Sequence, residues 1–336
     1  MTNELDADAA FKPSAFWREI NDKNLQMLMA DGIDNFKRTL SHNYYSWLIV
    51  SPFARHFRYI VKDWLLHPTV APLGTRIEPD LAVRLTTHSD PVVLSARQRL
   101  LYRIYVSCVW ERMLRADSRG LALKVGEPDL GNPIRVWRNN QIITQDLANS
   151  IVEANLMSGL LSGTGNTPRI AELGAGSGRL AHVFSTTHPG TYHIFDIPPA
   201  LLVSQWYLDR VLAGKRVFHF RHFHDFEEIR NELSSADVAF FTANQMAKFP
   251  PGYFDLIVSI STLPEARPDQ VTLFLNLFQT LSKRFIYLKQ WRSWKNPLDG
   301  TFLTIDDYTF GREWHVVRDE MDPINPLFFN RVWQRQ

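Results

Sequence analysis

Two acidic residues and three glycines in the middle of the chain have the types and spacing of a nucleotide-cofactor site. In the run RIAELGAGSGRL, an apolar segment ends in Glu172, glycines follow at 174, 176 and 178, and a helical segment begins at Arg179. Glycine permits positive φ and lets a ligand approach the backbone, and a helix N-terminus directs amide protons at it. About twenty residues later Asp196 ends a second apolar run, where a carboxylate can accept both hydroxyls of a ribose.

The spacing of the glycines bears on which ribose-bearing cofactor is bound. The dinucleotide fingerprint is G-x-G-x-x-G, but here the third glycine comes one residue early and Arg179 takes its place. NAD and a turn that binds nothing remain as alternatives. The form E-x-G-x-G-x-G resembles motif I of the Rossmann-like methyltransferases that use S-adenosylmethionine. That resemblance implies that the turn lies under the methionine part of the cofactor and that Asp196 holds the ribose. The contacts expected on this basis are Glu172, Gly174, Ala175, Gly176, Asp196 and Ile197.

Several further segments make the resemblance to the methyltransferases more specific. The runs EPDLGNP and ITQDLANSIVE precede the glycine turn, DIPPALLVSQWYL follows Asp196, and YLKQW stands at 287–291. Together they resemble a bacterial family of sugar O-methyltransferases over roughly the last two thirds of the chain. The resemblance implies methyl transfer from S-adenosylmethionine to a sugar hydroxyl, on a nucleotide sugar or a glycan.

The later strands supply the remaining candidate contacts. The pattern V-x-F-F-x-x-N followed by a loop and FDLIV resembles the passage from the third to the fourth strand of these methyltransferases. The resemblance places Asn244, with Gln245 beside it, at the adenine amino group. Because ligands bind beyond the carboxyl ends of parallel strands, Ser259 and the residues that follow it, and the end of the strand at Lys289–Trp291, belong to the same edge.

An alcohol is a poor nucleophile at neutral pH, so a base near the acceptor is expected. Glu265 follows the fourth strand and is the acid of an S-x-x-E-M pattern associated with the family, although Thr262 and Ala266 depart from that pattern. Its alternative role is to cap a helix. Lys289 is the second candidate for contact with substrate, and its alternative is a surface ion pair.

Two further segments are candidates for the substrate site. Gln145 and Asp146 open a helix with Thr144 as its N-cap, and they either contribute polar groups to the SAM carboxylate or to substrate, or form a solvated face. Trp291, with Trp294 nearby, can stack on the face of a sugar.

No metal site is expected. His222 and His224 share one face of a predicted strand next to Asp225, which is at most a fragment of a divalent metal site. Magnesium prefers carboxylate and water to imidazole, and strand histidines beside aromatic residues are more often packed or exposed than bound to metal.

The order of elements predicts an α/β fold. Strands alternate with helices in the second half, and Val271, Phe274, Leu275 and Phe278 mark an amphipathic helix over 268–281. We expect a mostly helical region over 1–149, with a hairpin near 133–144, that caps the site. Residues 150–336 are expected to form a Rossmann-like SAM-binding sheet with helices on both faces, closed by an antiparallel pair at 301–305 and 330–333.

Composition limits the class of protein. The 336 residues are 45% hydrophobic and 21% charged, with a formal net charge of +2 and one cysteine. These values are typical of a globular protein without a disulfide framework or a basic block for nucleic acid. No run reaches the roughly twenty apolar residues of a membrane span, so a cytoplasmic enzyme with a small-molecule or saccharide substrate is expected, with a homo-oligomer possible. Methylation of a non-sugar metabolite, or a non-catalytic SAM-binding partner in glycan assembly, are the rival functions.

Overall fold

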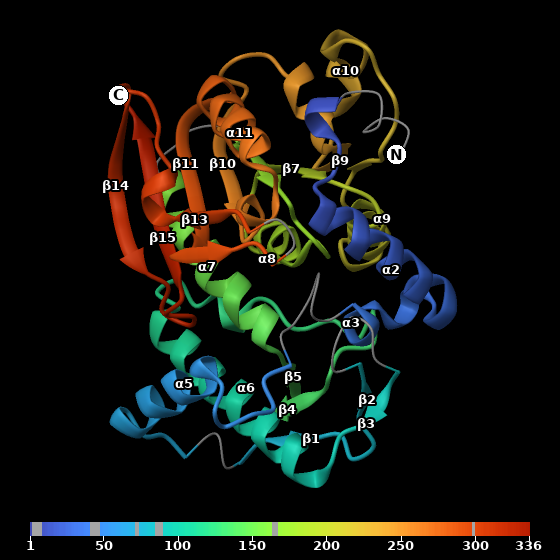
Figure 1. Ribbon diagram of the computed structural model, residues 1–336, viewed down its shortest axis with the longest axis vertical. Helices are drawn as coiled ribbons and strands as arrows, with labels where there is room; N and C mark the ends of the chain where they lie inside the picture. Colours follow the sequence, from blue (N-terminus) through green and yellow to red (C-terminus); the bar gives the residue numbers. More distant parts are fainter. Residues whose placement is uncertain (2–8, 41–47, 71–73, 85–89, 163–166, 298–299) are drawn as a thin grey trace.

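An eight-stranded sheet forms the upper half of the molecule in Figure 1, in the order β14-β15-β11-β10-β6-β7-β9-β8. The computed structural model describes residues 1, 9–40, 48–70, 74–84, 90–162, 167–297 and 300–336. The strands of this sheet are β6 (Arg169–Leu173), β7 (Thr191–Asp196), β8 (Val217–Phe218), β9 (Val238–Thr242), β10 (Phe254–Ile260), β11 (Ser282–Trp291), β14 (Trp314–Met321) and β15 (Phe328–Arg335). The strands from β6 to β11 pair in parallel, β15 is antiparallel to β11, and β14 is antiparallel to β15.

Alternation along the central strands sends side chains to two separate cores. In β6, Ile170 belongs to the core under α7, α8 and α9, whereas Ala171 belongs to the core under α11. This is the pattern of a parallel sheet covered on both faces. The covering helices are α7 (Gln145–Leu161), α8 (Arg179–Thr187) and α9 (Ala200–Val211) on one face, and α10 (Arg230–Leu233) and α11 (Pro268–Leu281) on the other. The α/β fold with helices on both faces of the sheet, predicted from the sequence, is confirmed.

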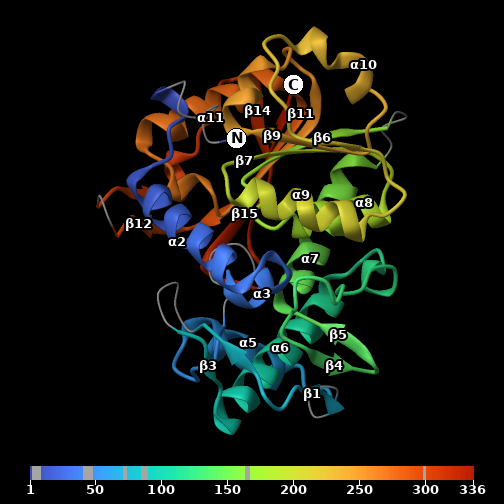
Figure 2. The same cartoon turned by 90° about the vertical axis from the view of Figure 1, so that its right-hand side faces the viewer.

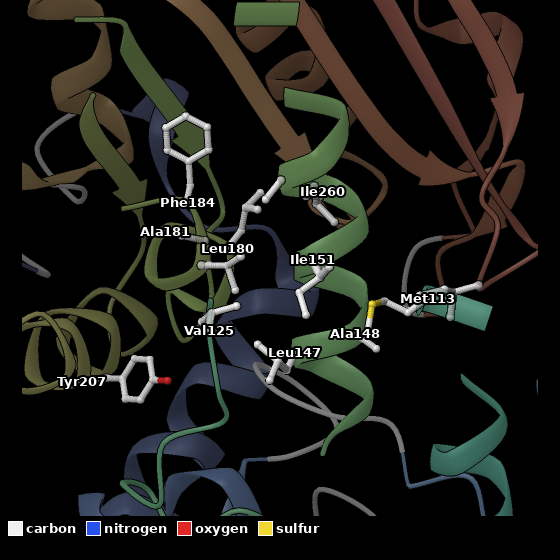
Figure 3. Packing of buried hydrophobic residues seen from close by; sticks show 14 of the residues in the cluster. Met113, Val125, Leu147, Ala148, Ile151, Leu180, Ala181, Phe184, Tyr207 and Ile260 are labelled. Atoms are coloured by element: carbon white, nitrogen blue, oxygen red, sulfur yellow. The ribbon is translucent and has the colours of Figure 1, made fainter. Parts of the chain in front are cut away.

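Helix α7 joins the two halves of the molecule. Its side chains Leu147 and Ile151 face Leu180 of α8, whereas Ala148 faces Met113 of α6, the helix Ala96–Ala116 (Figure 3). Thr144 caps the helix as predicted, because its hydroxyl accepts a hydrogen bond from the amide of Leu147 at 3.1 Å.

The N-terminal half is mostly helical, as predicted. Its elements α5, α6 and β1 to β5 lie below the sheet in Figures 1 and 2, whereas α2 lies beside the sheet. Gly32 ends α2 with a positive φ of 78°, and Ser95 opens α6 with a capping box. The predicted hairpin is formed by β4 and β5 around a turn at Asn139 and Asn140. The elements are α2 (Ala15–Asp31), α3 (Phe36–Thr39), α5 (Arg55–Leu66), α6 (Ala96–Ala116), β1 (Arg76–Ile77), β2 (Ala82–Val83), β3 (Val92–Val93), β4 (Val136–Arg138) and β5 (Gln141–Ile143).

Short 3-10 turns connect many of these elements. They are η1 (Ala9–Phe11), η2 (Ile33–Asn35), η4 (Leu121–Leu123), η5 (Phe226–Glu228), η6 (Ala243–Lys248), η7 (Leu263–Glu265) and η8 (Ile305–Asp307).

The predicted final strand pair is wrong in its first member. The segment 301–305 contains β13 (Phe302–Thr304), which pairs with β12 (Ser293–Lys295) in a separate two-stranded sheet. The true partner of β15 is β14, where most side chains are exposed. A strand exposed on both faces has no apolar alternation, so its sequence lacks the signal on which the prediction depended. The strand predicted to carry His222 and His224 is also shorter than expected, because only Val217 and Phe218 pair with β9.

The division of the chain near residue 150 remains a prediction. Helix α7 runs through this position from Gln145 to Leu161. Over the described residues, every helix is too short or too polar to cross a bilayer.

Candidate functional site

A cavity of about 370 Å³ lies beyond the carboxyl ends of β6, β7, β10 and β11. This volume is within the usual range for small-molecule and cofactor sites. Its walls come from the glycine turn after β6, the end of β7, η7, the end of β11, the first turn of α7 and residues 11–20 of η1 and α2. Segments far apart in the sequence therefore meet at the sheet edge that the strand order selects.

The glycine turn adopts the backbone conformation that its sequence requires. Gly174 and Gly176 have φ values of 79° and 58°, and the amide of Gly174 donates to the carbonyl of Phe195 at 2.8 Å. A Cβ at residue 174 would lie 2.0 Å from Oγ1 of Thr262. Glycine at 174 is thus needed both for its left-handed conformation and for the approach of the loop after β10.

Asp196 is placed beside this turn by β7. Its carboxylate accepts hydrogen bonds from the amides of Gly176 at 2.8 Å and Ile197 at 2.7 Å. Burial nevertheless raises the pKa of Asp196 to about 7, because the amides offset only part of the desolvation of the charge. Asp196 also lines the cavity. Its carboxylate can therefore accept a hydrogen bond from a ligand hydroxyl in place of one from a backbone amide.

Glu172 lies at the end of β6 and is buried. It accepts a hydrogen bond from the hydroxyl of Tyr192 at 2.9 Å. Burial raises the pKa of Glu172 to about 7. Together with Asp196, it makes the floor of the cavity acidic.

Glu265 ends η7 and reaches the cavity from the other side. Burial, and then the charge of Asp196, raise the pKa of Glu265 to about 8. Its backbone carbonyl accepts a hydrogen bond from Ser14 at 2.8 Å, while its side chain lines the cavity. The arrangement gives a carboxyl group that changes its ionisation in the neutral to mildly alkaline range.

A network of buried charges supports one wall. Glu153 of α7 binds Arg179 at 2.6 Å and Lys289 of β11 at 2.9 Å. Lys289 also binds Asp322 at 2.8 Å. Although burial alone would raise it, the two cations lower the pKa of Glu153 to about 2. The two carboxylates likewise raise the pKa of Lys289 against the effect of burial.

Two alternatives considered for this region are wrong. The helix face that Gln145 and Asp146 open is buried rather than solvated, because Glu153 on the same helix binds Arg179 of α8 and Lys289 of β11. Lys289 is 3% exposed and makes a buried ion pair rather than a surface one. A lysine that is held protonated by two carboxylates is not suited to act as a general base.

Aromatic residues from β11, β12 and β15 form the opposite wall. The ring of Trp291 lies 5.4 Å from that of Trp294 and 4.6 Å from that of Phe328, measured between centroids. All three line the cavity, and we call them the tryptophan wall. Within the described residues, the Nε1 of Trp294 is buried and has no hydrogen-bond partner.

The N-terminal segment closes the cavity. Phe11 packs edge-on against Phe274 of α11 with 5.9 Å between centroids. Arg267 donates to the carbonyl of Lys12 at 2.6 Å, and Gln270 donates to the same carbonyl at 2.9 Å. Trp17 and other residues of α2 complete this side. We call residues 9–14 the N-terminal strap.

Most of the predicted contacts come together in the cavity, although their roles stay predictions. The lining includes Gln145, Asp146, Glu172, Gly174, Ala175, Gly176, Asp196, Ile197, Glu265, Lys289 and Trp291.

Three predicted cofactor contacts lie outside this lining. Gln245 is fully buried, and its side-chain amide accepts from the backbone of Thr242 and donates to that of Arg221. Ser259 is buried in β10, where its hydroxyl accepts from Gln290. Asn244 lies in η6 next to Ala243, and it is Ala243 that lines the cavity. The positions of these three residues do not support their assignment as cofactor contacts. The side chain of Gln245 bonds backbone groups of Thr242 and Arg221, and that of Ser259 bonds Gln290 of β11.

Several lining residues were not predicted. They include the strap and α2 residues Phe11, Pro13, Ser14, Phe16, Trp17 and Ile20, and also Tyr105, Asn149, Ile324, Asn325 and Phe328. The N-terminal residues carry no motif, so only their packing in three dimensions identifies them. Asn149 lies in the family-like run ITQDLANS, which was the one available signal.

Among the described residues, the histidines at 219, 222 and 224 do not lie in a group of side chains that could bind a metal. Where the structure describes the chain, no three His, Cys, Asp or Glu side chains stand close enough to hold a metal. His219 instead bonds Asp209 at 2.9 Å near the surface.

The solved structures that are similar to this chain include methyltransferases. The magnesium protoporphyrin IX methyltransferase from Synechocystis PCC 6803 with bound SAM is 12% identical, with a TM-score of 0.38, over 56% of this chain and 84% of that one. The methyltransferase YhhF of Escherichia coli is 13% identical, with a TM-score of 0.36, over 55% of this chain and 85% of that one. No family model and no curated protein matches the chain. Because these TM-scores are low, the fold is assigned from the strand order of the sheet and not from these similar structures.

Proposed function

We propose that this chain is an S-adenosylmethionine-dependent methyltransferase that transfers a methyl group to a hydroxyl of a saccharide. The observation that carries the proposal is the cavity directly beyond the glycine turn, bordered by Asp196 on one side and Glu265 on the other. It joins a candidate cofactor site and a candidate proton acceptor in one cavity.

The residues of the cavity fit the cofactor. Gly174 and Gly176 leave the backbone open toward the methionine part, and Asp196 is positioned for the ribose hydroxyls. Ala243, Leu263 and Phe274 offer apolar surface for an adenine ring. Gln145 has a buried Oε1 without a hydrogen-bond partner among the described residues, and it can accept from the methionine ammonium group.

The net acidity of the lining also suits this ligand. S-adenosylmethionine is a sulfonium cation, and when bound it supplies the methyl: the acceptor oxygen forms a bond to the methyl carbon, the carbon–sulfur bond breaks, and the hydroxyl proton is left for a base. Asp196 and Glu172 provide negative charge on the floor of the cavity. A nearby cation favours the ionised form of both acids.

Glu265 is the residue we assign to the hydroxyl proton. Its carboxylate can accept that proton when ionised, and its raised pKa of about 8 makes it a stronger base than an exposed glutamate. Lys289 is given a positioning role instead, since it ties α7 and the β14–β15 turn to the site through Glu153 and Asp322.

The saccharide acceptor is supported by the tryptophan wall and by the family resemblance. Indole rings offer flat apolar faces on which the C–H face of a sugar can stack, and Trp294 adds a donor for a hydroxyl. Transfer to a non-sugar metabolite is the rival reaction, and a non-catalytic SAM-binding protein of glycan assembly is the rival outside catalysis.

Incubation of the purified protein with methyl-labelled S-adenosylmethionine and a panel of saccharides and phenols tests the proposal. We expect label in a saccharide, and a rate lower by about 10²–10⁴-fold for Glu265→Gln. Glu232→Gln is the matched control, because Glu232 is exposed in α10 and is not part of the cavity lining. Label only in a phenol would favour the first rival, and cofactor binding without transfer to any acceptor would favour the second.

A further inference from the structure

The charged side chains that line the cavity indicate whether the methyl acceptor is charged or neutral. This inference rests on the proposed methyl transfer. Its lining residues include two cations, Arg179 and Lys289, and four acids: Asp146, Glu172, Asp196 and Glu265. Every lysine and arginine of the chain lies in the described residues, because the segments outside them contain neither type. The acids outnumber the cations on the walls, and because burial raises the pKa of three of the acids to about 7 or 8, the lining holds no excess of positive charge near neutral pH.

Both lining cations are neutralised within the protein. Arg179 makes two hydrogen bonds to Glu153, of 2.6 and 3.1 Å, and a third to Ser150. Lys289 lies between Glu153 and Asp322 and is almost fully buried. Moving Lys289 to an incoming anion would leave the buried carboxylate of Asp322 without its cation, and moving Arg179 would take from Glu153 one of its two cations, so either movement is unfavourable.

A phosphate or diphosphate on the reacting sugar would meet this acidic surface without a free cation to balance it. Phosphate recognition in proteins normally uses arginine, lysine or a helix N-terminus. The N-terminus of α8 is at the glycine turn, where the proposed cofactor lies. The N-terminus of α7 also lines the cavity, but Asp146 places a carboxylate in its first turn, which opposes the binding of an anion there. Among the described residues, the lining therefore offers a phosphate no unpaired cation.

The uncharged groups of the cavity fit a neutral sugar. The tryptophan wall supplies stacking surface, and the Nε1 of Trp294 is a buried donor without a partner among the described residues. Asn149 and Asn325 add carboxamides to the same lining. Flat apolar faces with neutral polar groups between them are suited to a ring that carries hydroxyls.

We propose that the acceptor is an uncharged saccharide, such as the end of a glycan or glycoside, which stacks on Trp291 and Trp294, and that sugars carrying an anomeric phosphate are excluded from the cavity. This deepens the proposed function, because it chooses between a nucleotide sugar and a glycan as the substrate.

The test measures binding, with matched pairs of ligands that differ at the anomeric position. Methyl glucoside, methyl galactoside and methyl mannoside are titrated against the corresponding sugar 1-phosphates, using protein saturated with S-adenosylhomocysteine and saturation-transfer NMR for weak ligands. We expect at least one glycoside to bind about tenfold more tightly than its 1-phosphate. Its affinity should not fall when sodium chloride is raised, because no charge pair forms.

A variant at the tryptophan wall checks the location. Trp294→Phe keeps an aromatic ring and removes the Nε1–H, so glycoside binding should weaken by about threefold to tenfold while S-adenosylhomocysteine binding stays unchanged. Trp206→Phe is the control, because Trp206 of α9 packs against Phe36 and lies outside the cavity lining, and it should change neither.

Tighter binding of a sugar 1-phosphate or of a nucleotide sugar than of the glycoside would overturn the inference. Failure of every glycoside to bind, with S-adenosylhomocysteine bound, would also overturn it but would leave the proposed cofactor intact. Failure of S-adenosylhomocysteine to bind would refute the proposed function itself.

Discussion

Lys289 and Glu153 are 136 residues apart in the sequence, yet the Nζ of the lysine lies 2.9 Å from Oε1 of the glutamate, and both side chains are buried. This pair joins β11 to α7, and Asp322 extends it to the turn between β14 and β15. The walls of the cavity are therefore connected by charge as well as by apolar packing.

Removing the charge of Lys289 should strongly destabilise the fold. In Lys289→Met, Glu153 retains Arg179 but Asp322 loses its cation, so the free energy of unfolding should fall by about 3–5 kcal/mol. Urea unfolding measures this change. Lys283 is exposed on the same strand, and Lys283→Met should cost less than about 0.5 kcal/mol.

The double variant Lys289→Met/Asp322→Asn separates this network from simple loss of packing. Because the second change removes the unpaired carboxylate, the pair should be less destabilised than the sum of the single variants. Additive losses would show that the ion pair is not the cause.

Alanine at position 174 should disrupt the glycine turn. Gly174→Ala would place a Cβ 2.0 Å from Thr262 in a left-handed backbone conformation, whereas Gly252→Ala, at a φ of 64°, meets nothing within 4 Å. Thermal unfolding of both variants therefore separates the clash from the backbone strain. Gly252→Ala should lose about 1–2 kcal/mol, and Gly174→Ala clearly more. Equal losses would mean that the turn has room to move away from Thr262.

Glu265→Gln should stabilise the ligand-free protein at high pH. The pKa of Glu265 is raised in the fold to about 8 from an ordinary value of 4.5, so between these values the folded protein binds more protons than the unfolded chain. The stability that this carboxyl contributes is present below about pH 4.5 and is lost as the pH rises through 8. The difference in Tm between Glu265→Gln and the wild-type protein should therefore be more positive at pH 8.5 than at pH 5. It should change by about 2–4 °C for each kcal/mol of stability gained.

Asp269→Asn is an opposite control for this effect. The hydrogen bond from Arg267 lowers the pKa of Asp269, so any stability from this acid is lost as the pH falls, and removing the acid should give no gain at high pH. A Tm difference for Glu265→Gln that does not depend on pH would contradict the assigned burial of its carboxyl.

Breaking the contacts of Arg267 should loosen the N-terminal strap. Its guanidinium donates to the carbonyls of Ala9, Ala10 and Lys12, so Arg267→Ala should increase amide exchange in residues 9–14. Arg230→Ala is the surface control, because Arg230 pairs with Glu227 nearby in the sequence. Unchanged exchange in the strap would show that Phe11 and Gln270 hold it without the arginine.

Local patterns allowed much of the fold to be predicted. The apolar spacing of Val271, Phe274 and Leu275 gave α11 over Pro268–Leu281 with the bounds that the structure has. The glycine turn and Asp196 were likewise recognisable, because their backbone and spacing requirements are local. Such features depend on residues within about one element of each other.

Contacts between distant segments could not be predicted in this way. Glu153, Lys289 and Asp322 are polar residues in otherwise apolar surroundings, and no spacing rule indicates that they meet. Phe11 and Trp17 belong to helical sequence without a motif, although they line the cavity. Strand β14 lacked apolar alternation because its side chains are exposed on both faces.

The measurement that tests the central claim most directly is calorimetric titration with S-adenosylhomocysteine and, separately, with NAD, on the wild-type protein and on Asp196→Asn and Asp209→Asn. Asp196 lines the cavity, whereas Asp209 bonds His219 near the surface. We expect S-adenosylhomocysteine to bind to the wild-type protein, to bind at least about tenfold more weakly to Asp196→Asn and to bind equally well to Asp209→Asn, and we expect NAD not to bind. Binding of NAD alone, or equal binding by the two variants, would contradict the claim.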